Sequence, residues 1–127
     1  MFKLEYDESA NILLIAFNEN SLSNASFRPL VHDVHQAINV FDKNRSMNRL
    51  FDLGKLTVPE IDMALLKDFS QITNIYNKEY QNIKIAIVTS TNLMFGEFRA
   101  YEVYAALPGI ERRIFRSLEE ARAWLIQ

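Results

Sequence analysis

The sequence contains no cysteine, which excludes disulfide bonds, catalytic thiols and metal sites that depend on cysteine ligands. Only three glycines and three prolines occur in 127 residues, so long flexible linkers and low-complexity tails are excluded as well. No apolar run approaches the roughly 20 residues that a membrane-spanning helix needs. The longest early apolar run, Ile12 to Phe17, follows three acidic residues and does not resemble a signal peptide. These absences predict a cytoplasmic protein with no membrane span.

A large excess of charge of either sign is also missing. The chain has 14 Lys and Arg against 16 Asp and Glu, and its formal net charge is −2. Proteins that bind nucleic acid need basic clusters to neutralise several phosphates, so we expect no nucleic-acid partner. With 49% apolar and 24% charged residues, the composition is typical of a globular protein. We therefore expect a single domain over residues 1–127, with a core that needs no metal or disulfide.

Two segments near the start predict a β-hairpin. Residues 2–7 alternate apolar and polar side chains, which is typical of a strand with one face in water. Residues 12–17 are apolar on both faces, which predicts a strand inside the sheet, and the turn-rich segment 7–11 joins the two. Three further strands are expected, over residues 49–53, 83–88 and 110–116. The strand 110–116 is highly charged, which predicts a position at an edge of the sheet.

Apolar residues at helical spacing predict four helices between and after these strands. The first helix follows a polar loop over 18–26 and starts at Phe27, with Ser26 as its N-cap. The second starts at a capping box, Thr57-Val-Pro-Glu60, and extends to about Tyr80. The third covers 93–107. The fourth starts at a second capping box, Ser117-Leu-Glu-Glu120, and its inward-facing residues are expected to be Leu118, Ala121, Trp124 and Leu125.

The order of elements, β-β-α-β-α-β-α-β-α, predicts an α/β fold in which four helices cover a mixed five-stranded sheet. This order and the closing stretch Arg113-Ile-Phe-Arg-Ser-Leu-Glu-Glu-Ala-Arg-Ala-Trp-Leu125 resemble the SpoIIAA-like family. That family is related to STAS domains, the anti-sigma-factor antagonists, and Phe51-Asp-Leu-Gly54 is similar to their Asp-Leu-Ser turn. The resemblance implies a non-catalytic module that binds a protein partner or a second copy of itself. The family's likeness to CRAL-TRIO domains implies an alternative, a small apolar or lipid-like ligand.

Thr57 has two interpretations. As the first residue of the capping box, it would accept hydrogen bonds from backbone amides at the start of the helix. STAS antagonists carry a phosphorylatable serine at the start of the corresponding helix, within an Asp-Ser-Ser-Gly-like segment. Here residues 54–60 contain no serine, and Thr57 is the only hydroxyl. A phosphate on Thr57 would lie at a helix N-terminus, where the helix dipole stabilises an anion.

Polar residues follow two strands that are predicted to run parallel. Asp52 lies near the end of strand 49–53, and Ser90 and Thr91 follow strand 83–88. Ligands of open α/β sheets gather at this carboxyl edge, so these residues and Thr57 form a candidate binding site. The alternatives are that Asp52 accepts hydrogen bonds from loop amides and that the loop 89–92 ends in a helix N-cap.

The third predicted helix has more apolar residues than one buried face needs. Phe95 and Tyr104 project away from its main stripe, which consists of Met94, Phe98, Tyr101 and Ala105. The surplus rings are either covered by a neighbouring loop or exposed as a protein interface or ligand-pocket wall. Phe95 and Tyr104 are therefore candidate binding residues.

No pattern predicts catalysis or a metal site. The nucleophile elbow, the Walker loop and the dinucleotide-binding glycine fingerprint are all missing. His32 and His35 are the only histidines, and no third ligand is evident nearby, so we interpret both as surface residues. A basic cluster on the last strand is interpreted as a guard of the sheet edge against aggregation: Arg112, Arg113 and Arg116. We expect no enzyme activity, no cofactor and no metal.

Overall fold

The computed structural model describes residues 2–19, 21–22, 24–59 and 63–127. Its main sheet has the strand order β1-β2-β4-β6-β7. The bounds of these strands are β1 Phe2–Asp7, β2 Ile12–Phe17, β4 Asn48–Leu53, β6 Ile83–Thr89 and β7 Ile110–Phe115. β1 pairs antiparallel with β2, and every other neighbouring pair in this sheet is parallel. The predicted mixed five-stranded sheet is therefore confirmed, with β2 inside it and β7 at its edge.

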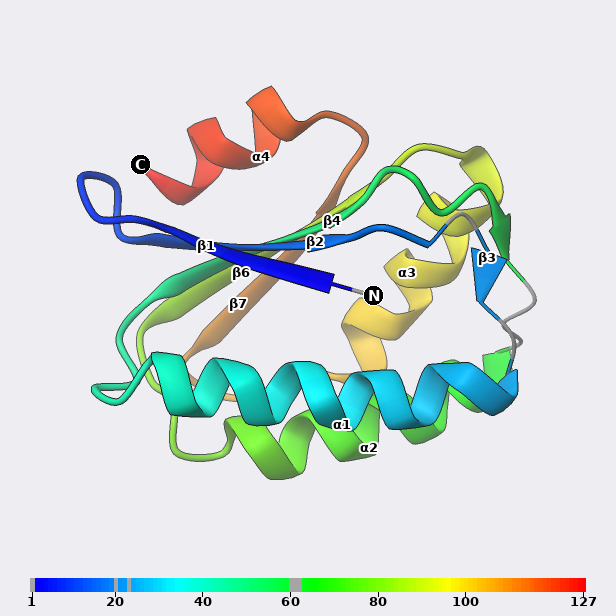
Figure 1. Ribbon diagram of the computed structural model, residues 1–127, viewed down its shortest axis with the longest axis horizontal. Helices are drawn as coiled ribbons and strands as arrows, with labels where there is room; N and C mark the ends of the chain where they lie inside the picture. Colours follow the sequence, from blue (N-terminus) through cyan, green and yellow to red (C-terminus); the bar gives the residue numbers. More distant parts are fainter. Residues whose placement is uncertain (1, 20, 23, 60–62) are drawn as a thin grey trace.

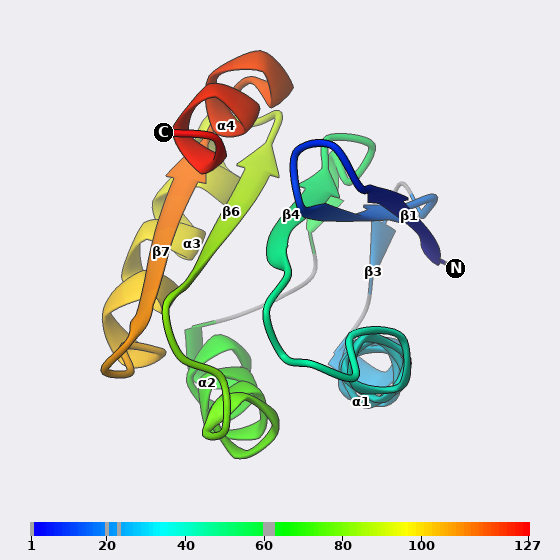
Figure 2. The same ribbon diagram turned by 90° about the vertical axis from the view of Figure 1, so that its left-hand side faces the viewer.

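Four helices in the described part of the chain cover this sheet: α1 Asn24–Phe41, α2 Met63–Asn77, α3 Asn92–Tyr104 and α4 Leu118–Leu125. Figure 1 shows α4 on one side of the sheet and α1 and α2 on the other. The view along the sheet in Figure 2 shows the same layers. A helix connects each parallel strand to the next, because a tight turn cannot join parallel strands.

Side-chain alternation along the strands divides the core into two layers. The layer against α1, α2 and α3 contains Leu13, Ile15, Ile85 and Ile87. The layer against α4 contains Ile12, Leu50, Ala86 and Val88. β2 and β6 contribute apolar residues to both layers and lie in the interior of the sheet, which the sequence predicts for β2.

Two predicted helix starts are wrong. α1 begins at Asn24, so Ser26 lies inside the helix rather than at its N-cap. α2 begins at Met63 rather than after Thr57. The expected start of this helix instead contains a short strand, β5 (Val58–Pro59). β5 pairs parallel with β3 (Ser21–Leu22), which lies within the loop expected over 18–26. A residue that precedes proline favours extended backbone, and this preference at Val58 overrides the capping-box pattern that begins at Thr57. Glu60, the other half of that predicted box, lies outside the described residues.

α4 begins where the sequence predicts. The Ser117 Oγ accepts a hydrogen bond from the Glu120 backbone N–H at 3.3 Å, which identifies Ser117 as the N-cap. Ala121, Trp124 and Leu125 are buried as expected, but Leu118 is 47% exposed and the prediction for it is wrong. Leu118 is the first residue of the helix, and it lies at the rim of a shallow groove between α4 and the first two strands.

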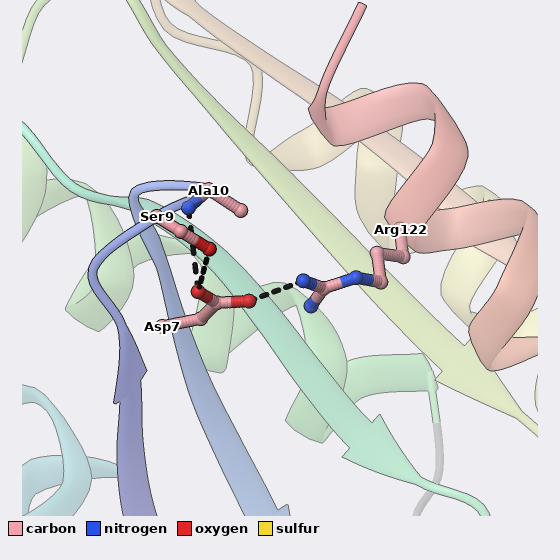
Figure 3. Close-up of polar contacts among 4 residues, drawn as sticks. All are labelled: Asp7, Ser9, Ala10 and Arg122. Carbon is pink, nitrogen blue, oxygen red and sulfur yellow. Dashed lines mark hydrogen bonds and ion pairs between the residues drawn. The ribbon is translucent and has the colours of Figure 1, made fainter.

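An ion pair spans this groove and connects the two ends of the chain. Arg122 of α4 donates to Asp7 at the end of β1. Figure 3 shows that the same carboxylate also accepts hydrogen bonds from the Ser9 hydroxyl, at 2.7 Å, and the Ala10 N–H, at 3.3 Å. The bond from Arg122, followed by that from Ser9, lowers the pKa of Asp7 to about 2.

Candidate functional site

The carboxyl edge of the sheet brings together two of the predicted site segments. β4 and β6 are neighbours and Leu53 pairs with Thr89, so the loops that follow these strands emerge side by side. Asp52 uses its Oδ1 to accept the Gly54 N–H at 2.9 Å. A Cβ on residue 54 would lie only 3.0 Å from that oxygen, so glycine permits this close approach. Asp52 therefore accepts a hydrogen bond from a loop amide, which is the alternative to ligand binding that the sequence offers for this residue.

The hydroxyl residues of this edge have different surroundings. Thr91 is the N-cap of α3, because its Oγ1 accepts the Met94 N–H at 3.1 Å. Ser90, the preceding residue, is exposed. Thr57 is also exposed and lies directly before β5. Because no helix begins at Thr57, the expected stabilisation of a phosphate there by a helix N-terminus does not apply.

Two of the described aromatic residues of α3 face inward. Phe98 and Tyr101 are each 2% exposed and belong to the core, together with Met94 and Ala105 of the predicted stripe. Phe95 is half-buried, and its ring centre lies 4.4 Å from the guanidinium carbon of Arg116. The side chain of Tyr104 lies outside what the structure describes.

A cavity of about 40 Å³ lies between the sheet and helices α1, α2 and α3. Most of its wall is apolar and includes Phe27, Val34, Phe51, Phe69, Ile87 and Phe98. Its polar lining residues are His35, Arg49, Thr73, Asn77, Tyr101 and Arg112. Five predicted binding residues are not part of this wall: Asp52, Thr57, Ser90, Thr91 and Phe95. The cavity is thus a second candidate site, separate from the carboxyl edge.

Two arginines reach this cavity from the sheet. Arg49 on β4 pairs with Ile85 on β6, and Ile85 pairs with Arg112 on β7. Residues paired in register share a face of the sheet, so both arginines lie on the face that carries α1, α2 and α3. The next row on this face consists of Phe51, Ile87 and Ile114, which is wholly apolar.

Arg49 is 0% exposed, which is unusual for a charged side chain. Its Nη1 donates to the Asn77 Oδ1 at 2.9 Å, and its guanidinium carbon lies 4.2 Å from the ring centre of Tyr80. Its Nε and Nη2 are buried without a hydrogen-bond partner, as is the Asn77 Nδ2. Burial lowers the pKa of Arg49, because the charged form loses its hydration.

Arg112 is mostly buried, so its interpretation as a surface guard of the sheet edge is wrong. Its Nη1 donates to the backbone carbonyl of Ala105, and its Nη2 is buried without a partner. Burial lowers its pKa, and the neighbouring Tyr101 opposes that shift. Arg113, the next residue on β7, is exposed, as expected for an outer position of an edge strand.

His35 also lines the cavity and is 3% exposed, so the prediction of a surface position is wrong. Its ring stacks on Tyr76 with centres 5.4 Å apart, and its Nδ1 lies 2.9 Å from the Val31 carbonyl oxygen. A carbonyl only accepts, so Nδ1 carries a proton. Burial lowers the pKa of His35 to about 4, which keeps the ring neutral near pH 7.

The two histidines engage different partners. The Nδ1 of His32 lies 2.9 Å from the Tyr76 hydroxyl, at an exposed position. Within the described ranges, no group of three or more His, Cys, Asp or Glu side chains could hold a metal ion. No helix in the part of the chain that was searched is long and apolar enough to cross a membrane.

Sequence reasoning missed the buried arginines, although a signal for them exists. Arg49, Phe51 and Leu53 alternate along one strand, so Arg49 shares the face of two large apolar residues. Arg112 similarly lies between Ile110 and Ile114 on β7. A charged residue on an apolar face of a strand is the pattern that indicates a buried cation.

A similar fold occurs in a solved structure, an uncharacterized protein of the DUF3478 family with a SpoIIAA-like fold from Shewanella loihica PV-4. The two structures share a TM-score of 0.63 and 14% sequence identity, over 98% of this chain and 92% of that chain. This likeness shows that the chain has the SpoIIAA-like fold that its sequence predicts. No family model matches the sequence, and no curated protein matches it.

Proposed function

We propose that this protein is a non-catalytic binding module that holds a small apolar ligand in the cavity between the sheet and helices α1, α2 and α3. The observation that carries the proposal is the cavity of about 40 Å³ itself. Protein interiors are packed as densely as organic crystals, and unfilled space loses contact energy. A space larger than the 10–15 Å³ or so that one water molecule needs therefore has room for a small molecule.

The groups around the cavity support binding rather than catalysis. His35 is neutral near pH 7, and its low pKa makes it a weak base. Burial raises the pKa of Tyr101, which makes its hydroxyl a poorer acid. The described lining residues include no carboxylate, so the acid–base pairs of many hydrolytic enzymes have no counterpart here.

The test compares backbone amide spectra before and after addition of 1-propanol, a small amphiphile. We expect shifts at lining residues, and we expect Val34→Phe to abolish them by filling the cavity. Val40→Phe adds the same ring to an exposed position of the same helix and serves as the matched control. The proposal fails if propanol shifts no lining amide, or if both variants respond as the wild type does.

A second candidate is a protein contact at the carboxyl edge, through a partner or a second copy of this chain. Leu93 favours it, because this residue is 59% exposed and follows the predicted site residues Ser90 and Thr91. The half-buried Phe95 lies on the same helix. Light scattering over a range of concentrations tests self-association: the candidate predicts a dimer that Leu93→Asp dissociates. A monomer at millimolar concentration excludes the self-association form of this candidate.

A further inference from the structure

The two arginines of the cavity carry positive charge that the described protein groups leave without a paired anion. The ion pairs within the described residues connect other side chains. The charge of Asp42 favours the protonated form of Arg49 and so raises the pKa of Arg49, but the two side chains form no ion pair. Both carboxylate oxygens of Asp42 accept backbone amides, from Ser46 at 3.1 Å and Met47 at 3.0 Å. Buried guanidinium groups usually have an anionic partner, because an unpaired buried charge is costly.

The unpaired groups of the cavity are all hydrogen-bond donors. Four buried nitrogens lack a partner: Arg49 Nε, Arg49 Nη2, Asn77 Nδ2 and Arg112 Nη2. All four belong to residues that line the cavity. Among the described lining residues, no buried side-chain acceptor atom lacks a hydrogen-bond partner. Water offers donors as well as acceptors, whereas an ionised carboxylate only accepts. The site therefore matches an acceptor-only group better than it matches water.

The free edge of Arg49 has the shape that a carboxylate recognises. Its Nη1 is occupied by Asn77, which leaves Nε and Nη2. These two nitrogens donate in parallel from one side of the planar guanidinium and bind both oxygens of a carboxylate at once. Because Nη1 is fixed by Asn77 and the guanidinium packs on the Tyr80 ring, this edge is held in place before any ligand arrives.

The remaining wall defines the rest of the ligand. Beyond the row of Arg49, Ile85 and Arg112 lies the apolar row that includes Phe51 and Ile87. A ligand with its anionic group on Arg49 would place its other atoms against these apolar side chains. The cavity of about 40 Å³ is much smaller than the roughly 150 Å³ that holds benzene, so the ligand must have fewer non-hydrogen atoms than benzene and a short tail.

We propose that the cavity binds a short-chain monocarboxylate of two or three carbons, with its carboxylate on the Arg49 fork and beside Arg112. This inference rests on the proposed function, because it names the class of ligand that the cavity would take. Arg49 would supply the bidentate contact. Arg112 would supply a second positive charge from β7, on the other side of β6. Phe51 and Ile87 would contact the tail.

The experiment titrates sodium propionate into the full chain at pH 7 and follows the side-chain Nε–H resonance of Arg49. 1-Propanol has the same chain length without the charge, and inorganic phosphate has the charge without the tail. We expect propionate to move the Arg49 resonance and to bind at least about tenfold more tightly than propanol, as a charged hydrogen bond allows. Phosphate is expected to bind more weakly than propionate.

Three variants locate the site. Arg49→Met and Arg112→Met are each expected to weaken propionate binding about tenfold or more, while propanol binding changes less than about threefold. Arg113→Met is the matched control, because this exposed arginine neighbours Arg112 on the same strand. It is expected to change propionate binding less than about twofold. Amide spectra of each variant establish that it is folded.

The outcomes separate the inference from the proposed function. Equal affinities for propionate and propanol at the lining residues would overturn the carboxylate assignment and leave an apolar ligand site. Tighter binding of phosphate than propionate would assign the arginines to another anion and overturn the proposal. Failure of both propionate and propanol to bind would overturn the inference and the proposed function together. Loss of propionate binding in Arg113→Met, but not in Arg49→Met, would also contradict it.

Discussion

Arg49 and Arg112 lie on either side of Ile85 in one row across three parallel strands. Neighbouring strands are about 4.8 Å apart, so the backbones of the two arginines are separated by roughly 10 Å. This row places two positive charges in the layer that α1, α2 and α3 cover, where the other described strand residues are mainly apolar. The arrangement costs stability in the free protein, as expected if the two charges serve to bind a ligand.

Replacement of Arg49 by methionine tests this cost. Exchange of a buried charge for an apolar side chain of similar size is often neutral or stabilising. Arg49→Met also removes the bond to Asn77 and the contact with Tyr80, so we expect an unfolding free energy that is unchanged or higher by up to about 2 kcal/mol. Denaturant unfolding measures it. A loss of more than about 2 kcal/mol would indicate that the protein already compensates this charge.

The burial of His35 predicts that stability depends on pH in a defined window. Its pKa is about 4 in the folded protein and 6.5 in the unfolded chain. Between these values the unfolded state binds the proton and the folded state does not, so stability decreases as the pH falls from 6.5 to 4. The difference of about 2.5 units corresponds to up to about 3 kcal/mol.

Unfolding curves at several pH values measure this dependence. His35→Phe keeps a ring between Tyr76 and the neighbouring aromatic residues, but it cannot take up a proton. The variant should therefore lose the part of the pH dependence that lies between pH 4 and 6.5. Parallel curves for the wild type and the variant would contradict the buried, neutral state of His35, in which Arg49, Arg112 and His32 also disfavour the proton.

The ion pair between Asp7 and Arg122 predicts a shifted titration at the surface. The folded pKa of Asp7 is lowered to about 2 from 3.8, so the ionised carboxylate stabilises the fold above pH 3.8, and this effect disappears as the pH falls through 2. Carbon-detected NMR of the Asp7 carboxyl measures this pKa. Arg122→Gln should move it back towards 3.8, because Arg122 is the largest cause of the shift. An unchanged pKa in the variant would mean that Ser9 and Ala10 hold the carboxylate without Arg122.

The two hydroxyl residues before α3 should respond differently to substitution. Thr91→Ala removes the N-cap acceptor for the Met94 amide and should destabilise the protein by about 1 kcal/mol. Ser90→Ala changes an exposed side chain and should alter stability by less than about 0.5 kcal/mol. Thermal unfolding compares the two variants. Equal losses would contradict the assignment of Thr91 as the cap.

The five strands of the main sheet could be predicted because their apolar patterns are strong. β1 alternates, whereas β2 and β6 are apolar on both faces, and these patterns indicate the strands and the interior position of β2. The start of α2 could not be predicted from the capping box at Thr57. The extended backbone before Pro59 and the pairing of β5 with β3 compete with a helix there, and that pairing joins segments far apart in the sequence.

The cavity depends on contacts that no local pattern contains. Arg49 and Arg112 are 63 positions apart in the numbering, and the register of β4, β6 and β7 brings them into one row. His35 lies three residues after His32, and such a pair differs by only about 60° in direction around a helix. This small rotation separates an exposed position from one that faces the aromatic interior, and the packing of α1 on α2 decides it.

The location of xenon in crystals of this protein under gas pressure shows whether the interior space can take up a ligand, because xenon enters apolar cavities without needing a charge. We expect an anomalous peak between the sheet and helices α1, α2 and α3, in contact with Phe51 and Ile87, and its loss in Val34→Phe crystals. Crystals in which xenon occupies surface grooves but leaves this space empty would contradict the claim that the interior of this protein is a ligand site.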